Sequence, residues 1–117
     1  MKISQVVDAL PALQKLATQD LSIKKLYAMR KMIGRFDEEL AFYNEQRNKL
    51  LSQYCDIVGN QYVPREEHIE KLNAEMRELL DTEIEGEIKE VVISVNEDVK
   101  LSYNDLMTLE GFVRIEE

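Results

Sequence analysis

The chain has 117 residues, with 23 Asp or Glu against 15 Lys or Arg, a net charge of −8, and 44% hydrophobic residues. With only four Gly and two Pro, this composition is typical of one folded, helix-rich domain and excludes a disordered tail. Cys55 is the single cysteine, which excludes an intrachain disulfide, and no apolar stretch approaches the ~20 residues of a membrane span, so we expect a soluble protein of a reducing cytoplasm.

The charge is unevenly distributed along the chain. Residues 1–59 carry +2, whereas residues 60–117 carry −10. Such asymmetry is typical either of an acidic surface that meets a basic partner or of two halves of one fold that attract each other. We favour the second interpretation, in which the net charge also keeps the protein soluble.

The first predicted helix runs from Ser4 to about Thr18, with Ser4 as a candidate N-cap. Pro11 lies inside this segment, where proline removes a backbone hydrogen bond. We expect one helix with a kink at Pro11, preceded by an extended N-terminus, rather than a new helix that begins at Pro11.

The second predicted helix begins after Asp20 or Ser22 and continues to about Tyr54, which is roughly 48 Å of helix. Nine of its positions alternate in steps of three and four residues, and eight of the nine are apolar or aromatic. This packing stripe consists of Leu26, Met29, Ile33, Phe36, Leu40, Tyr43, Arg47, Leu50 and Tyr54. A repeat that averages 3.5 residues keeps one narrow edge of a helix against partner helices, as in coiled coils.

Two residues interrupt the stripe or its helix. Gly34 predicts a close approach of another helix or a local bend, because glycine in a helix costs about 1 kcal/mol relative to alanine. Arg47 is the one charged residue of the stripe. It either packs its stem while its head reaches a glutamate, or it selects a register or partner, with Glu66, Glu67 or Glu70 as its counterpart.

A hairpin turn at Gly59–Asn60 is predicted to lead into a third helix over residues 65–82, with Pro64 in its first turn. At about 27 Å, this helix is long enough to cover only the C-terminal part of the second helix. We expect the first helix to cover the N-terminal part.

After residue 82 the apolar spacing changes from helical to alternating. We expect a strand over residues 83–88 with carboxylates on one face and an irregularity near Lys89–Glu90. After it, Val91, Ile93 and Val95 form the apolar set of the other parity, and a turn follows at residues 96–98. The candidate partner surface here consists of Glu83, Glu85, Glu87 and Glu90. Ser102 and Asp105 then form a capping-box pattern, which predicts a short helix that ends before Gly111 and is followed by a tail that docks or frays.

The sequence contains no motif for catalysis, for a cofactor or for a metal. Its glycines are scattered and build no phosphate-binding loop. The single histidine, His68, has Pro64 and Leu72 four residues away, so it lacks a helical ligand pair and is expected on the surface of the third helix. Cys55 is expected to be a buried structural thiol. We therefore predict no enzymatic activity, no catalytic residues, no cofactor and no metal site.

Five cations lie within twelve residues of the second helix and form a candidate basic face: Lys24, Lys25, Arg30, Lys31 and Arg35. Such a face is typical of nucleic-acid binding, but a net charge of −8 repels phosphate, so we favour a solvated face paired with the acidic half. Conversely, the carboxylates of residues 83–90 could mimic nucleic-acid phosphates. A single row, spaced about 6.6 Å along a strand, is too sparse for this. The third helix would have to add Glu70, Glu75, Glu78 and Asp81 as a second row.

Three segments carry a family resemblance: the run 9–16 before a long charged helix, the Glu-rich run 79–85, and the ending 101–112. In this order they resemble a family of small proteins of unknown function that are encoded by phages and prophages of Gram-positive bacteria. Many members end with a Glu-Pro-Phe-like step, where this chain has Glu110-Gly111-Phe112. The resemblance implies a phage origin and the cytoplasm of a bacterial host, with association with the virion left open. It implies no catalytic residue.

These observations predict a helix-dominated α+β fold with a long central helix, two antiparallel helices, a small strand pair and a short C-terminal helix. One domain is expected over residues 1–117, with a helix–helix spine in 1–64 and an acidic helix, strands and C-terminal helix in 65–117. The predicted function is non-enzymatic, through contacts with a host or phage protein or with further copies of the chain. The alternative is a nucleic-acid-related factor, which acts through the basic face or as an acidic mimic. No membrane partner is expected.

Overall fold

The computed structural model describes residues 1–86, 88–94 and 99–116. Its elements are α1 (Ile3–Ala17), α2 (Ile23–Arg35), α3 (Asp37–Tyr54), β1 (Cys55–Val58), β2 (Gln61–Pro64), the short 3₁₀ helix η1 (Glu66–His68), α4 (Ile69–Leu80), β3 (Val91–Ser94), α5 (Tyr103–Thr108) and β4 (Val113–Glu116). The predicted helix-dominated α+β class is confirmed, with two small sheets in place of the single strand pair expected.

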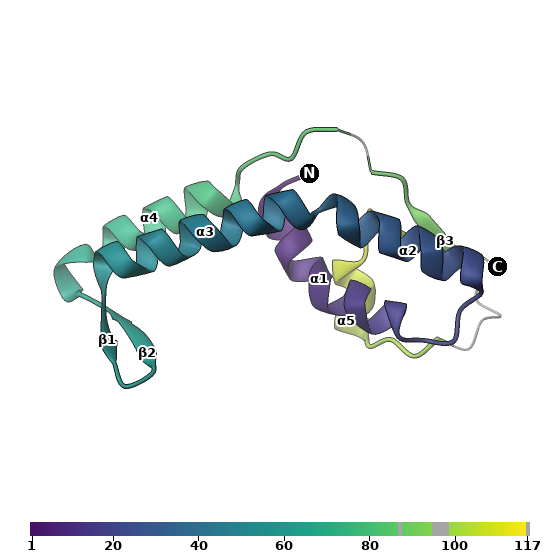
Figure 1. Ribbon diagram of the computed structural model, residues 1–117, viewed down its shortest axis with the longest axis horizontal. Coiled ribbons are helices and arrows are strands. Elements are labelled where there is room, and N and C mark those ends of the chain that lie inside the picture. Colours follow the sequence, from purple (N-terminus) through teal and green to yellow (C-terminus); the bar gives the residue numbers. More distant parts are fainter. Residues whose placement is uncertain (87, 95–98, 117) are drawn as a thin grey trace.

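The molecule is elongated, with extents of 53 × 31 × 20 Å. Its radius of gyration is 17.2 Å, compared with about 13 Å for a compact domain of this length. Figure 1 shows the reason. The body, made of α1, α2, β3, α5 and β4, lies at one end. The arm, residues 37–80, projects from it as the antiparallel pair α3 and α4 with the β1–β2 hairpin at its far end.

Helix α1 is the centre of the body. It is one helix across Pro11, as predicted, because Pro11 lies on its exposed face while the opposite face, with Val6, Leu13 and Leu16, is completely buried. The predicted N-cap Ser4 is wrong, because Lys2 occupies that position. Lys2 instead forms an antiparallel bridge with Glu83, which holds the N-terminus extended beside the chain that leaves α4.

The central helix is bent. Ser22 caps α2, its Oγ accepting a hydrogen bond from the backbone N–H of Lys25 at 3.4 Å. Our prediction of a continuous helix is wrong at Phe36, where α2 ends and α3 begins (Figure 1). The buried Phe36 ring packs edge-on against Phe112 at 5.8 Å between centroids, while α3 leaves the body. The three acidic residues of the first turn of α3 also favour a helix start there, because they complement the helix dipole.

The packing stripe faces inward on both sides of this bend, as predicted. From Leu26 to Tyr43 its residues belong to the core of the body, and Leu50 and Tyr54 belong to a second, smaller core in the arm. Arg47 lies between the two cores and is exposed. In the part of the chain that the structure describes, it forms no ion pair with the predicted partners Glu66, Glu67 and Glu70.

Gly34 is not a site of close helix approach, because a Cβ added there has no atom within 4 Å. We therefore expect Gly34→Ala to stabilise the protein by about 1 kcal/mol, since the substitution removes only the flexibility of glycine. Urea unfolding measures the change. Gly59→Ala is the matched control and should destabilise, because Gly59 has a φ of +63°. A loss of stability in Gly34→Ala would show that the neighbouring bend needs glycine.

The predicted hairpin is confirmed: β1 and β2 are antiparallel, with Val58 opposite Gln61 across the turn. Pro64 is the last residue of β2 rather than part of a helix, and η1 precedes α4. His68 is therefore not on the surface of a long third helix. It is half-buried in η1, with its ring 5.5 Å from that of Tyr54.

The predicted acidic strand over residues 83–88 is wrong. Among its described residues, only Glu83 makes a β-bridge. The alternation expected after the irregularity is confirmed at Val91 and Ile93, which are the buried residues of β3. Alternating side chains alone do not make a strand, because the backbone also needs a neighbour with which to pair. Glu87 and the predicted turn at residues 96–98 lie outside the described residues.

The predicted capping box is confirmed. The backbone N–H of Asp105 donates to Ser102 Oγ at 3.1 Å, and the N–H of Ser102 donates to Asp105 Oδ2 at 3.0 Å. Lys15 also donates to this carboxylate, at 2.8 Å, and with Ser102 it lowers the pKa of Asp105. After α5 the chain docks as β4, parallel to β3, and Phe112 is buried in the body.

Candidate functional site

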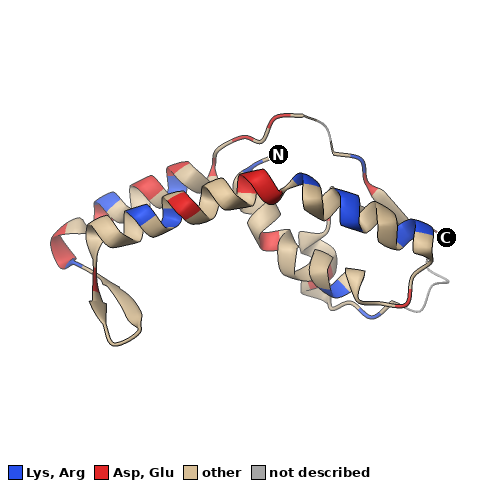
Figure 2. Ribbon diagram, viewed as in Figure 1, with Lys and Arg blue, Asp and Glu red and all other residues tan. Residues whose placement is uncertain are grey.

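The candidate basic face occupies α2, which contains five cations and no acidic residue (Figure 2). The structure divides the predicted set. Lys24, Lys31 and Arg35 line one groove, whereas Arg30 is exposed elsewhere and Lys25 is half-buried. Lys24, Lys31 and Arg35 follow one another at steps of seven and four residues, which places them on one side of the helix.

The groove has a volume of about 440 Å³ and lies between α2 and the segment that enters β3. Its lining residues are Lys24, Tyr27, Ala28, Lys31, Met32, Arg35, Ile88, Lys89, Glu90 and Val91. The buried or half-buried floor is apolar, with Ala28, Met32, Ile88 and Val91. We call this site the basic groove. It combines cations at its rim with room for an apolar side chain at its centre.

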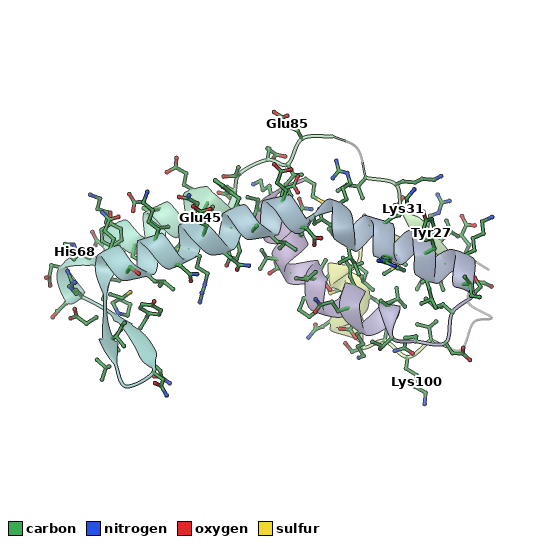
Figure 3. All side chains as sticks on the ribbon, in the orientation of Figure 1. Tyr27, Lys31, Glu45, His68, Glu85 and Lys100 are labelled. Carbon is green, nitrogen blue, oxygen red and sulfur yellow. The ribbon has the colours of Figure 1, made fainter. Side chains whose placement is uncertain are left out.

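Tyr27 and Lys31 are exposed residues of the basic groove that contact each other. The Tyr27 side chain is 59% exposed, and Lys31 Nζ lies 5.3 Å from the centre of its ring, a cation–π contact (Figure 3). Sequence reasoning found Lys31 but missed Lys89, which comes from a segment more than fifty residues away. The local spacing of cations in α2 carries no information about that segment.

Arg35 closes the end of the basic groove nearest the bend. Its Nη2 donates to the carbonyl oxygen of Glu85 at 3.0 Å and so fixes that segment against α2. Gly86 is required beside it, because its φ is +92° and an added Cβ would lie 2.5 Å from Arg35 Nη2. Arg35 thus links α2 to the segment at Glu85 and also contributes a positive charge to the basic groove.

The candidate acidic surface does not form as predicted. Glu83 and Glu85 flank a hollow of about 450 Å³ with Glu38, Glu39 and Phe42 of α3. Glu90, in contrast, lies at the rim of the basic groove. Since these described carboxylates do not lie on one strand, they lack the regular row that we required for mimicry of a nucleic acid.

Sequence reasoning missed the surface at the far end of the arm. The hairpin tip, defined here by Ile57, Val58, Tyr62 and Val63, has four exposed apolar or aromatic side chains. Ile57 is 70% exposed. Within the part of the chain that the structure describes, each strand pairs only with the other, so no described strand pairs with the backbone groups at the two edges of the hairpin. Two apolar dipeptides on either side of the predicted turn were the available indication.

A buried cluster at the base of the hairpin holds the tip in place. Cys55 and Tyr54 are buried here with Leu72, so the expected burial of the thiol is confirmed. Burial, and then the neighbouring Glu75 carboxylate, raise the pKa of Tyr54. The His68 ring contacts Tyr54 at an interplanar angle of 54°, 5.5 Å between ring centres. Among residues 1–86, 88–94 and 99–116, no three His, Cys, Asp or Glu side chains gather to hold a metal.

Comparisons of the chain with protein-family models, with curated proteins and with solved structures give no match. Of the helices in the described residues, none combines the length and apolar character that crossing a membrane requires. The surfaces themselves are therefore the basis for the function proposed below.

Proposed function

We propose that this chain is a non-enzymatic interaction protein of phage or prophage origin, which binds a protein partner through the hairpin tip of its arm. The observation that carries the proposal is the exposure of Ile57, Val58, Tyr62 and Val63 together at the end of a projecting arm. In the hairpin register, Ile57 and Tyr62 share one face and Val58 and Val63 the other, so both faces of the tip expose apolar side chains, which are typical of sites for protein contacts. Their charge-free character favours an apolar partner surface rather than a nucleic acid.

The shape of the arm supports this function. Burial of Cys55, Tyr54 and Leu72 fixes the hairpin to α3 and α4, so the tip is held at one end of a molecule whose longest extent is 53 Å. The free strand edges add backbone groups that a partner strand can use. The phage or prophage origin rests on the sequence resemblance alone.

The test is site-specific photo-crosslinking of the full chain in an extract of the cells that produce it. A photoreactive phenylalanine analogue replaces Tyr62 at the tip or, as the matched control, the exposed Tyr103 on α5. We expect one defined protein to crosslink from position 62 and not from position 103. The double variant Ile57→Ser, Val58→Ser should abolish this crosslink while leaving the circular dichroism spectrum unchanged.

Equal crosslinking from both positions, or a crosslink that survives the double variant, would contradict binding at the tip. No defined product from position 62 would contradict it as well. A crosslink to a second copy would identify the chain as its own partner at this site.

A further inference from the structure

We propose that the basic groove on α2 binds the acidic face of α3 from a second copy of this chain. This acidic face consists of Glu38, Phe42 and Glu45. The contact is separate from the hairpin tip, so it does not depend on the function proposed above. It places the Phe42 ring of one copy over the apolar floor of the other copy's groove.

The two faces match in spacing. In the basic groove, Lys24, Ala28 and Lys31 follow one another at steps of four and three residues. On α3, Glu38, Phe42 and Glu45 follow at the same steps. Each set therefore covers two helical turns, about 10.5 Å, with a charge at each end and an uncharged side chain between them.

Antiparallel pairing of these two helices brings opposite charges together. Lys24 of one copy then faces Glu45 of the other, and Lys31 faces Glu38. Figure 3 shows the Lys31 and Glu45 side chains on α2 and α3, on opposite sides of the bend. Within the described residues, Lys24, Lys31 and Lys89 form no ion pair, so these cations remain available to carboxylates of a partner.

Phe42 is the aromatic residue that suits the floor of the groove. It is 47% exposed, and it belongs to the acidic hollow together with Glu38, Glu39, Glu83 and Glu85. The groove offers Ala28, Met32, Ile88 and Val91 as apolar contacts. Burying an exposed phenylalanine supplies hydrophobic stabilisation, while the charges around it fix the orientation.

Charge separation along the chain favours a partner of this kind. Because α2 carries five positive charges and the whole chain −8, the rest of the chain carries −13. A second copy has the same net charge of −8, so the attraction is local, between the basic groove and the acidic first turns of its α3. A nucleic acid would also supply negative charge, but its phosphates leave the apolar floor unused, and Glu90 at the rim repels them.

The test is a charge exchange followed by sedimentation velocity of the full chain at low and high salt. Lys24→Glu with Lys31→Glu, and separately Glu38→Lys with Glu45→Lys, should each weaken self-association about tenfold or more. The variant that carries all four substitutions should restore association to within about threefold of the original, since each pair is re-formed with its signs reversed. Salt should weaken association of the unchanged chain.

The control for the first pair is Arg30→Glu with Lys100→Glu, which makes the same change in net charge at exposed positions outside both faces. It should change association less than about threefold. The tip variant Ile57→Ser, Val58→Ser should leave association intact, so that failure of this proposal and failure at the tip can be told apart.

A chain that stays monomeric, or four substitutions that fail to restore association, would overturn the proposal. So would tight binding of single-stranded oligothymidine to a monomer that is lost in Lys24→Glu, Lys31→Glu but kept in the control. That result would assign the basic groove to nucleic acid.

Discussion

Replacing Phe36 by alanine should lower the free energy of unfolding by about 3–5 kcal/mol. Phe36 has no exposed surface and packs edge-on against Phe112, in a geometry that contributes beyond the buried area alone. The substitution leaves a cavity at the point where α2, α3 and the chain after α5 meet. Because a domain of this size is stabilised by only about 5–15 kcal/mol, we expect a large shift of the urea midpoint.

Phe42→Ala is the matched control, because Phe42 is also in the central helix but lies at the surface. It should change stability by less than about 0.5 kcal/mol, while weakening the self-association proposed above. An equal decrease in the free energy of unfolding in the two variants would show that the Phe36 side chain stabilises the bend no more than a surface phenylalanine does.

Leu72→Ala should destabilise the arm by about 2–5 kcal/mol while leaving most of the body protected. Leu72 is buried with Tyr54 and Cys55 in a small core that is separate from the core of the body. Few buried contacts hold a unit of this kind together, so it can open locally. Native-state hydrogen exchange should therefore speed up at amides of α4, β1 and β2, and remain slow in α1.

Ile69→Ala provides the comparison on the same helix, since Ile69 is exposed. Its exchange rates should stay close to those of the original chain. If Leu72→Ala accelerated exchange equally in α1, the arm and the body would unfold as a single cooperative unit, and the two cores would not be independent.

The long-range arrangement of the helices could be predicted from the packing stripe. Its steps of three and four residues correctly placed Leu26 and Tyr54 on one buried edge, with α1 along the first part and α4 along the last. The stripe could not predict the bend at Phe36, although Gly34, two residues earlier, indicated a local bend as one of two alternatives. The stripe continues through it in register, and Phe112, the ring that Phe36 contacts at the bend, is far away in the sequence.

The strands show where local patterns carry too little information. The turn at Gly59 was sufficient to predict β1 and β2, because a hairpin pairs neighbouring segments. In contrast, β3 pairs in parallel with β4, with Val91 opposite Val113, and nothing near either strand specifies that choice. The alternation of acidic and apolar side chains over residues 83–88 was misleading, because a local pattern does not specify whether another strand lies beside the segment.

The candidate surfaces were predicted only in part. Three of the five cations on α2 line the basic groove, but the apolar floor and Lys89 come from a distant segment. The hairpin tip was missed, because exposure depends on how far the arm projects from the body. That distance is a property of the tertiary structure.

Because Phe36 alone separates α2 from α3, a small rotation at this residue moves the far end of the arm by a larger distance. Since α3 spans about 27 Å, a rotation of about 10° at Phe36 would displace the distant hairpin by about 5 Å. Phe112 packs against Phe36 from the C-terminal segment, and α1 also contacts α3 and α4 near this point. We therefore expect a substitution that reshapes the space around Phe112 to shift the distant hairpin further than it shifts Phe36 itself.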